Sequence, residues 1–194
     1  MDEMSTMISK TRSLEERLAD HIGEQREGRG WSVADLAERS GVSRAMISKI
    51  ERGEAMPTAS LLARLSVAFG VPLSQLFAQV ETETSPVARA ADRTWWKDPE
   101  TGYRRRAVSP AHDTLLQLTE AELPPGARVP FAADTYRFIH QQIWVIDGKL
   151  TFHEGRDVHE LSPGDCLMLG PPSDCVFENA TRKACRYVVA VVRR

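Results

Sequence analysis

The spacing of apolar residues changes part-way along this 194-residue chain, and that change limits the folds it can adopt. Residues 11–78 carry apolar side chains at helical spacing, beginning with Leu14, Leu18 and Ile22. From about residue 94 the chain is rich in Val, Tyr, Trp and Phe, and turn-forming residues interrupt it about every eight to twelve positions. The sequence therefore predicts an all-α bundle joined to an all-β sandwich or barrel.

A polar stretch, VETETSPVARAAD, separates the two patterns over residues 80–92. It has no large apolar anchor, which is typical of a linker. We therefore expect a helical domain over residues 11–78, a linker over 79–93 and a β domain over 94–194.

Composition narrows the class of protein. The content of 42% hydrophobic and 27% charged residues is that of a soluble globular protein. A net charge of −2 argues against indiscriminate coating of nucleic acid but leaves room for a small basic face. The N-terminal residues lack the apolar core of a signal peptide, and no apolar run is long enough to span a bilayer. Three cysteines near the C-terminus are too few and too clustered for a disulfide framework, so we expect a cytoplasmic protein without a membrane partner.

Start and stop signals divide the first domain into five short helices. Ser13 with Glu16 and Ser32 with Asp35 form capping-box patterns, in which side chain and backbone bond reciprocally. Gly41 is expected to end the second helix, because glycine enters the left-handed conformation at little cost. The remaining boundaries are caps at Ser43 and Thr58, a stop at Gly70, and a last helical turn, PLSQLF, at 72–77.

The break at Ser40-Gly41 is very short, since another helix begins after Ser43. The polar side of that third helix is small, hydrogen-bonding and positive, which suits the major groove of DNA. A short turn would lay one helix across the DNA backbone while the next enters the groove. The alternative is a solvated helix face in an ordinary bundle. The candidate DNA contacts are Ser43, Arg44, Ala45, Ser48 and Lys49, flanked by Arg39 and Arg52.

Residues 14–77 resemble the lambda-repressor/Cro type of helix–turn–helix, the XRE family. The resemblance lies in Leu36-Ala37, Gly41-Val42-Ser43, Ile47, Ile50, Glu51-Arg52-Gly53, Pro57 and Leu76-Phe77. It implies binding to a double-stranded DNA operator, as a homodimer. One departure is Val33, at a position where family members often carry a phosphate-binding Gln. A bundle that binds protein instead of DNA is the alternative, although the acidic residues of the first helix lie away from the reading face.

The second part contains seven strand-like stretches: TLLQLTEAEL, IHQQIWVID, KLTFHEG, DVHELS, CLMLG, CVFENA and CRYVVAVVRR. Asp147-Gly148 predicts a hairpin between two of them. A closed or double-sheet barrel would cover strands that are apolar on both faces. Residues 107–192 resemble a cupin, with Gly148 in the first motif and GDCLMLGPPSDCVFEN, 164–179, as the second. WWKDPETGYRRR, 95–106, looks like the lead-in of regulators that join an XRE domain to a cupin.

The cupin resemblance implies four metal-ligand positions, which fall on Asp134, Tyr136, Gln141 and Cys175. None is the expected His or Glu, and Gln is a weak ligand for transition metals. We therefore expect no metal, no cofactor and no enzymatic activity. A non-standard site of Cys175 with His140 or Asp134 is the alternative, although strand alternation places His140 and Gln141 on opposite faces.

A barrel without its metal would keep a cavity with apolar walls and a few polar groups, as a small-molecule site requires. The alternative is a filled core. For Cys175 three interpretations stay open: a buried apolar residue, a pocket wall, or a redox switch, alone or with Cys166 or Cys185. His112, His153 and His159 are expected in solvent, and Trp95 and Trp96 either in the core or against the helical domain. The expected pocket residues are Tyr136, Gln141, Ile143, Val145, Cys175 and Phe177.

Together these features predict a DNA-binding transcriptional regulator whose metal-free cupin-like domain senses a small-molecule effector, dimerises, or does both. Effector binding would shift the population toward one placement of two reading heads. Two alternatives remain at this point. One is a cupin enzyme with a non-standard metal site, and the other is a regulator that senses redox state through cysteine.

Overall fold

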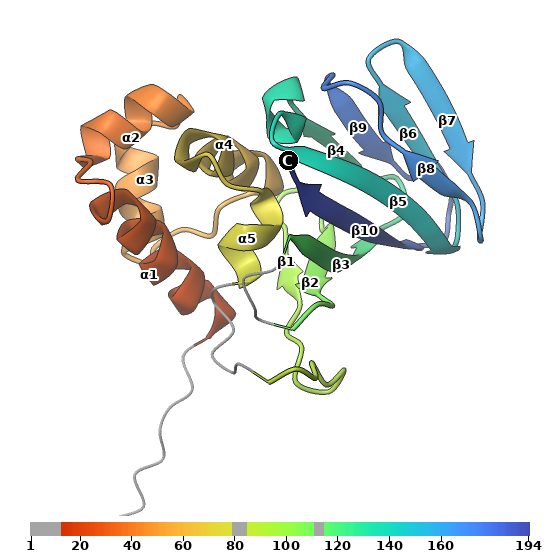
Figure 1. Ribbon diagram of the computed structural model, residues 1–194, viewed down its shortest axis with the longest axis horizontal. Coiled ribbons are helices and arrows are strands. Elements are labelled where there is room, and N and C mark those ends of the chain that lie inside the picture. The colour runs from red at the N-terminus through yellow and green to blue at the C-terminus, as the bar shows by residue number, and fades with distance from the viewer. Residues whose placement is uncertain (1–12, 79–84, 111–114) are drawn as a thin grey trace, which may run out of the picture.

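The computed structural model describes residues 13–78, 85–110 and 115–194. Residues 79–84 of the predicted linker and His112 lie outside these ranges. Five helices form the N-terminal part, as predicted, and Figure 1 shows them beside the β strands. They are α1 (Leu14–Glu27), α2 (Val33–Ser40), α3 (Arg44–Glu51), α4 (Ala59–Phe69) and α5 (Leu73–Ala78).

The first four helices begin at the predicted caps. In α1 the Ser13 Oγ accepts a hydrogen bond from the Glu16 N–H at 3.1 Å, and the Glu16 carboxylate accepts one from the Ser13 N–H at 2.9 Å. Ser32 and Asp35 repeat this reciprocal arrangement in α2. Such caps each contribute about 1 kcal/mol, because they satisfy N–H groups that have no partner within the helix. Apolar side chains from all five helices are fully buried: Leu18, Ile22, Leu36, Ile47, Ile50, Leu62, Leu65 and Leu76.

The C-terminal part consists of two antiparallel sheets. The strands are β1 (Trp96–Lys97), β2 (Arg104–Ala107), β3 (Leu116–Leu123), β4 (Arg128–Phe131), β5 (Ile139–Asp147), β6 (Leu150–Glu154), β7 (Asp157–Leu161), β8 (Cys166–Met168), β9 (Cys175–Glu178) and β10 (Cys185–Arg193), with a 3₁₀ turn, η1 (Ala133–Tyr136), between β4 and β5. One sheet has the order β1-β2-β3-β10-β5-β8 and the other β4-β9-β6-β7. Strands β3 to β10 thus divide equally between two facing sheets in the order of a jelly roll, the architecture that includes cupins. The predicted all-β barrel is confirmed.

Two sequence-based expectations about the strands need correction. Asp147-Gly148 is not a hairpin, because β5 and β6 belong to different sheets. Glycine is required there for another reason: its φ is +80°, and a Cβ would lie 2.5 Å from the Ala184 carbonyl oxygen. Strand β4, which contains Pro130, was not among the predicted strands. Proline is tolerated in β4 because the strand is at the edge of its sheet.

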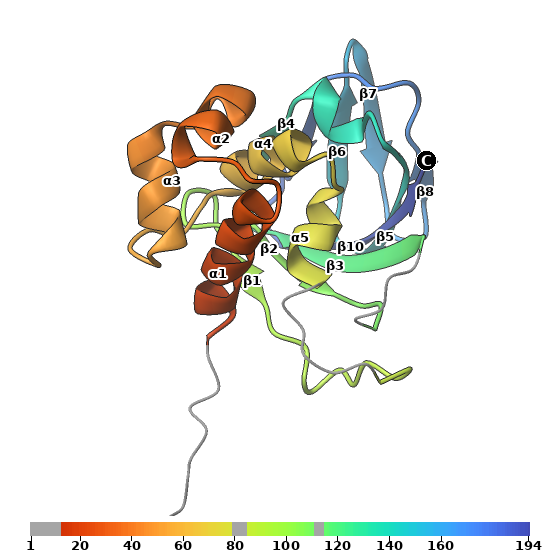
Figure 2. The ribbon, with the colours of Figure 1, turned by 60° about the vertical axis from the view of Figure 1, so that its left-hand side comes forward.

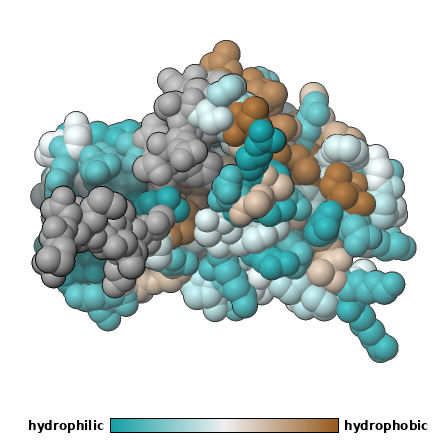
Figure 3. Space-filling model, turned by 90° about the horizontal axis from the view of Figure 1, so that it is seen from below, coloured by the Kyte–Doolittle hydropathy of each residue, from teal (hydrophilic) through white to brown (hydrophobic). Residues whose placement is uncertain are grey.

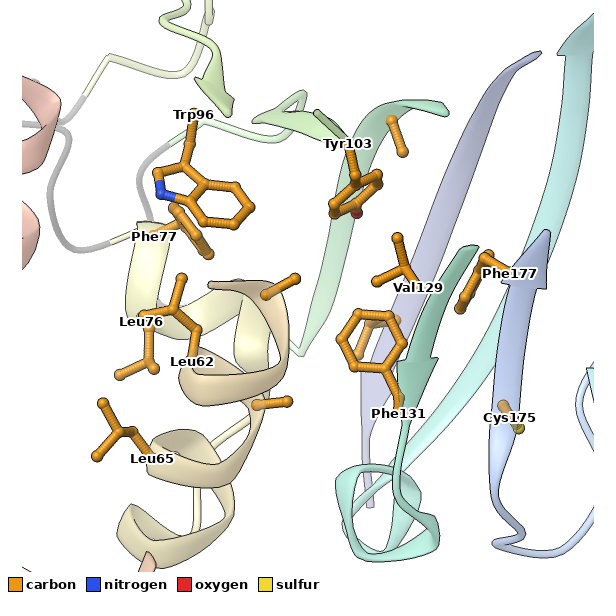
Figure 4. Packing of buried hydrophobic residues seen from close by; sticks show 14 of the residues in the cluster. Leu62, Leu65, Leu76, Phe77, Trp96, Tyr103, Val129, Phe131, Cys175 and Phe177 are labelled. Atoms are coloured by element: carbon orange, nitrogen blue, oxygen red, sulfur yellow. The ribbon is translucent and has the colours of Figure 1, made fainter. Parts of the chain in front are cut away.

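The helical and β parts pack against each other along α4 and α5. α4 contacts β4 and η1, and α5 contacts β2. Trp96 decides the question left open by the sequence: it is buried, its ring meets Phe77 edge-on at 5.4 Å, and its Nε1–H points at the Met56 sulfur 3.3 Å away. Figure 4 shows Trp96 over Phe77 at the end of the helical domain. In the part of the chain that the structure describes, no helix is long and apolar enough to cross a membrane.

Candidate nucleic-acid interface and ligand cavity

The turn between α2 and α3 is held by specific bonds. Gly41 ends α2 with a φ of +63°, in the left-handed region. The Ser40 Oγ donates to the Leu36 carbonyl at 2.6 Å and accepts from the Val42 N–H at 3.2 Å. From α4, the Arg64 guanidinium donates to the carbonyl oxygens of Ser40 and Gly41. The angle between α2 and α3 is therefore fixed by both helices and by α4.

An ion pair holds α3 against α1. The Arg26 guanidinium donates two parallel hydrogen bonds to the Glu51 carboxylate, at 2.8 and 2.9 Å. Both side chains are largely buried, with exposed fractions of 12% and 14%. The bond to Glu51 raises the pKa of Arg26. Two parallel hydrogen bonds of this kind hold α3 against α1 and also fix its orientation.

The opposite side of α3 is open to solvent. Arg44, Ala45 and Lys49 are exposed and Ser48 is half-buried, whereas Ile47 and Ile50 are buried. Figure 2 places α3 at the edge of the helical domain that is remote from the β strands. A short helix with two cations, a hydroxyl and a methyl group on its free side can enter a DNA major groove without obstruction from the β domain.

A cavity of about 50 Å³ lies where α5 meets the interior of the jelly roll. In this conformation it has room for a few water molecules. Pro72 and the first two residues of α5, Leu73 and Ser74, form one wall, and Tyr103 and residues of β2, β3, β4, η1, β5, β9 and β10 form the others. Helical domain and barrel thus share one internal site.

Comparison with known proteins agrees with this geometry. A helix–turn–helix family model, HTH_3, matches residues 22–76, which include α2, the turn and α3. These residues are a helix–turn–helix domain.

Relatives extend the similarity beyond that domain. The chain is 24% identical over 168 residues to the HTH-type transcriptional regulator SutR of Escherichia coli (strain K12), covering 84% of this chain and 86% of SutR. It is 38% identical over 73 residues to an HTH-type transcriptional regulator of Mycobacterium tuberculosis, covering 36% of this chain and 52% of that protein. The crystal structure of an HTH_3 family transcriptional regulator from Vibrio cholerae has a TM-score of 0.73 at 22% identity and covers 92% of this chain and 96% of its own. The whole two-part fold is thus shared with a solved structure.

Three of the seven candidate DNA contacts in the helix–turn–helix domain already have partners. The Arg39 guanidinium lies 4.4 Å from the Trp31 ring centre, and Arg52 forms two bonds of 2.7 Å with Glu54. The Ser43 Oγ accepts from the Met46 N–H at 3.2 Å as the cap of α3. These three side chains are exposed and near the turn, but each would have to give up or share its present contact in order to bind DNA. Val33 packs against the core at the start of α2.

The predicted pocket residues divide into two groups. Tyr136, Gln141 and Phe177 line the cavity. Ile143, Val145 and Cys175 also point inward but are in the packed interior and not on the wall of this cavity, so their assignment as pocket residues stays a prediction. The pKa of Tyr136 is raised well above its usual value by burial, and Cys175 lies within hydrogen-bond reach of it. Figure 4 shows Phe131 and Phe177 next to each other inside the barrel. Their rings meet edge to face, with ring centres 5.7 Å apart.

The four inherited metal positions do not form a ligand set. Asp134 is exposed and pairs with Arg137 at 3.4 Å, outside the cavity. His140 is exposed and Gln141 is buried, so the two side chains lie on opposite faces of β5. Within the described ranges, no three residues of the His, Cys, Asp or Glu types lie together as a metal site would require.

The structure also corrects the expectation for two histidines. His153 and His159 are not free in solvent: their Nε2 atoms lie 2.7 Å from Glu178 and 3.5 Å from Glu154. Both are about one-third exposed or less and belong to the second sheet.

The most unusual residue of the cavity, Arg105 in β2, was not among the predicted site residues. The signal was present in RRR at 104–106, because alternation along a strand turns the middle arginine to the opposite face from its neighbours. Without knowing that this segment is a strand of the barrel, the triplet looks like a solvated basic run.

Proposed function

We propose that this protein is a DNA-binding transcriptional regulator in which α3 reads an operator and the jelly roll binds a small-molecule ligand. The observation that supports this most strongly is the basic, unobstructed face of α3 within a matched helix–turn–helix domain. Three of the proteins similar to it are regulators by name. Binding to chromosomal DNA would place the protein in the cytoplasm.

The cavity gives the ligand a physical route to DNA affinity. Its walls come from α5 and from the barrel, so a ligand that fills it changes the contact between the two parts. A ligand that fits one arrangement better than another shifts the population toward that arrangement. Helix–turn–helix dimers are sensitive to such shifts, because their half-sites are about 34 Å apart and both heads must fit.

A homodimer is the proposed binding form, and the outer face of the six-stranded sheet is its candidate interface. Apolar side chains on neighbouring strands point outward there, including Trp144 and Met168, which are 51% and 65% exposed. Leu116 and Val192 continue the surface on β3 and β10. Figure 3 shows hydrophobic patches over the β domain and a mainly hydrophilic helical end. A patch of this kind on a protein surface favours association.

We propose no catalytic role for the barrel. The positions at which a cupin binds its metal hold Tyr136, Gln141, Cys175 and the outward-facing Asp134. Gln is a weak ligand for a transition metal, and burial raises the pKa of Tyr136 and of Cys175, which disfavours the deprotonated forms that bind metal. The redox alternative conflicts with Cys175, because burial raises the pKa of its thiol, whereas a sensor thiol needs a lowered pKa.

Charge reversal on α3 tests the reading role. Operator duplexes are first selected from a random library with the wild-type protein, and their affinity is then measured for Arg44→Glu. We expect affinity to fall at least about tenfold, because a base contact by Arg is worth about 1–3 kcal/mol, while Tm stays within a degree or two. Arg156→Glu, at another exposed arginine, in the β6–β7 turn, is the matched control. Equal operator affinity for the two variants would rule out α3 as the reading helix.

A further inference from the structure

Three consecutive arginines in β2 have different surroundings. Arg104 donates to the Glu122 carboxylate at 2.8 Å, Arg106 donates to Glu120 at 2.8 Å, and both guanidinium groups lie over the Trp95 ring. Arg105 points the other way, into the barrel, and is 7% exposed. The positive charges of Arg104 and Arg106 are each balanced by a carboxylate. The surroundings of Arg105 decide whether its charge is balanced too.

Within the described residues, Arg105 has no carboxylate partner. Its Nη2–H donates to the Thr119 Oγ1 at 3.2 Å, and its guanidinium carbon lies 4.5 Å from the centre of the Phe77 ring. Burial lowers the pKa of this guanidinium, although nearby Tyr103 and Tyr187 oppose the shift. An arginine remains protonated even so, and a buried cation without a counter-ion is costly to keep. Of the five N–H donors of the Arg105 guanidinium, one therefore has an acceptor, which is neutral, and the group also lies against one aromatic ring.

Two other buried polar groups near Arg105 lack hydrogen-bond partners among the described residues, and one of them is on the cavity wall. Ser74, at 8% exposure, lines the cavity, and its Oγ has no hydrogen-bond partner among the residues described. Gln117 is not on the cavity wall but lies on the same inward face of β3 as Thr119, and its buried Oε1 also has no hydrogen-bond partner among the described residues. Among the residues that the structure describes, no Asp or Glu lines the cavity. Unpaired buried polar groups beside a cavity are typical of a ligand site.

We propose that this cavity binds a small organic monocarboxylate, with Arg105 holding the carboxylate. The carboxylate matches the planar fork of the guanidinium and supplies the missing charge. One negative charge balances one cation, whereas a dianion would leave an excess charge inside the barrel. Apolar side chains, among them Phe131, Ile139 and Val191, form much of the remaining wall and suit a short hydrocarbon group. A volume of about 50 Å³ limits that group to a few carbon atoms unless the cavity expands.

Propionate is the probe and propionamide its uncharged isostere. Binding is measured on the full chain by calorimetry and by Tm, at constant chloride. We expect propionate to bind and raise the Tm by several degrees near saturation, and propionamide to have little effect. Sulfate, a dianion, should bind at least about tenfold more weakly than propionate.

Two variants test whether Arg105 is the arginine that binds propionate. Arg105→Met should lower propionate affinity at least about tenfold, the loss expected for a charge-assisted pair. Arg104→Met makes the same change on the outer face of the same strand and should bind propionate like the wild type. Equal binding of propionate and propionamide to wild type would overturn the proposal even if Arg105→Met did not fold, and so would undiminished binding by a folded Arg105→Met.

The inference rests on the proposed sensing role, and the two can fail separately. If propionate and other short monocarboxylates do not bind but the operator binding that depends on Arg44 is intact, the ligand assignment is wrong and the regulator stands. If no operator binding is found, the proposed function is wrong whatever the cavity binds.

Discussion

The three cysteines occupy different environments, and those environments decide what each thiol can do. Cys166 is exposed at the outer face of β8, while Cys175 and Cys185 are buried. Burial raises the pKa of Cys185 to about 11 and also raises that of Cys175. Only a small fraction of either buried thiol is thiolate near neutral pH, and the thiolate is the reactive form.

Alkylation should therefore distinguish the three sites. The protein is treated with iodoacetamide at pH 7.5, and modification of each cysteine is followed by mass spectrometry of the peptides. We expect rapid modification of Cys166 alone. Cys166→Ser should remove the fast phase, and denaturant should restore reactivity at Cys175 and Cys185. Fast modification of Cys175 in the folded protein would revive a redox role for that residue.

The same contrast of faces explains why Arg105 matters. Its neighbours Arg104 and Arg106 lie on the outer side of β2 and pair with glutamates of β3, as charged residues on a sheet surface usually do. A shift of one position along a strand carries a side chain from solvent to the interior. At the scale of single residues, the functional meaning of a basic run depends on that alternation.

At the scale of elements, the α2–turn–α3 unit depends on Gly41. Its φ of +63° costs any residue with a Cβ about 1–2 kcal/mol. A Cβ would also lie 2.6 Å from an Arg64 nitrogen, displacing the side chain that bonds the turn. Gly30 has a similar φ of +67°, but a Cβ added there would meet nothing within 4 Å.

Gly41→Ala should thus lower the free energy of unfolding more than Gly30→Ala, by about 1–2 kcal/mol from the lost Arg64 bonds. Urea denaturation of both variants measures this. Adding Arg64→Ala should remove most of the difference, since the side chain that is displaced would be absent. Equal losses for Gly30→Ala and Gly41→Ala would show that Arg64 does not hold the turn.

Elements with local signals were predictable from sequence. Ser13, Ser32, Ser43 and Thr58 each mark a helix start, because a cap satisfies backbone donors a few residues away. Features set by distant partners were not. The glycine of Asp147-Gly148 signals a turn but not whether the strands on either side pair with each other. Likewise Ile143 and Val145 point inward as alternation predicts, but where a cavity remains depends on residues from α5, β2 and β10.

At the scale of the whole molecule, the helical domain and the barrel meet over a buried contact. Trp96 joins Phe77 and Met56 across it, and Arg193 of β10 reaches Gln75 of α5 at 3.5 Å. The cavity with Arg105 is part of this contact, and α3 lies on the far side of the helical domain (Figures 1 and 2). A ligand bound in the cavity would therefore contact the helical domain that carries α3 without contacting DNA.

Operator affinity with and without a ligand in the cavity tests this coupling most directly. Fluorescence anisotropy with a selected operator duplex is measured without propionate and at propionate concentrations that saturate the protein. We expect the operator Kd to change at least about fivefold in the wild type, the lower range of allosteric coupling, and to stay constant for Arg105→Met or with propionamide. An operator Kd that is the same for the free and the saturated wild-type protein would contradict the coupling between cavity and reading helix.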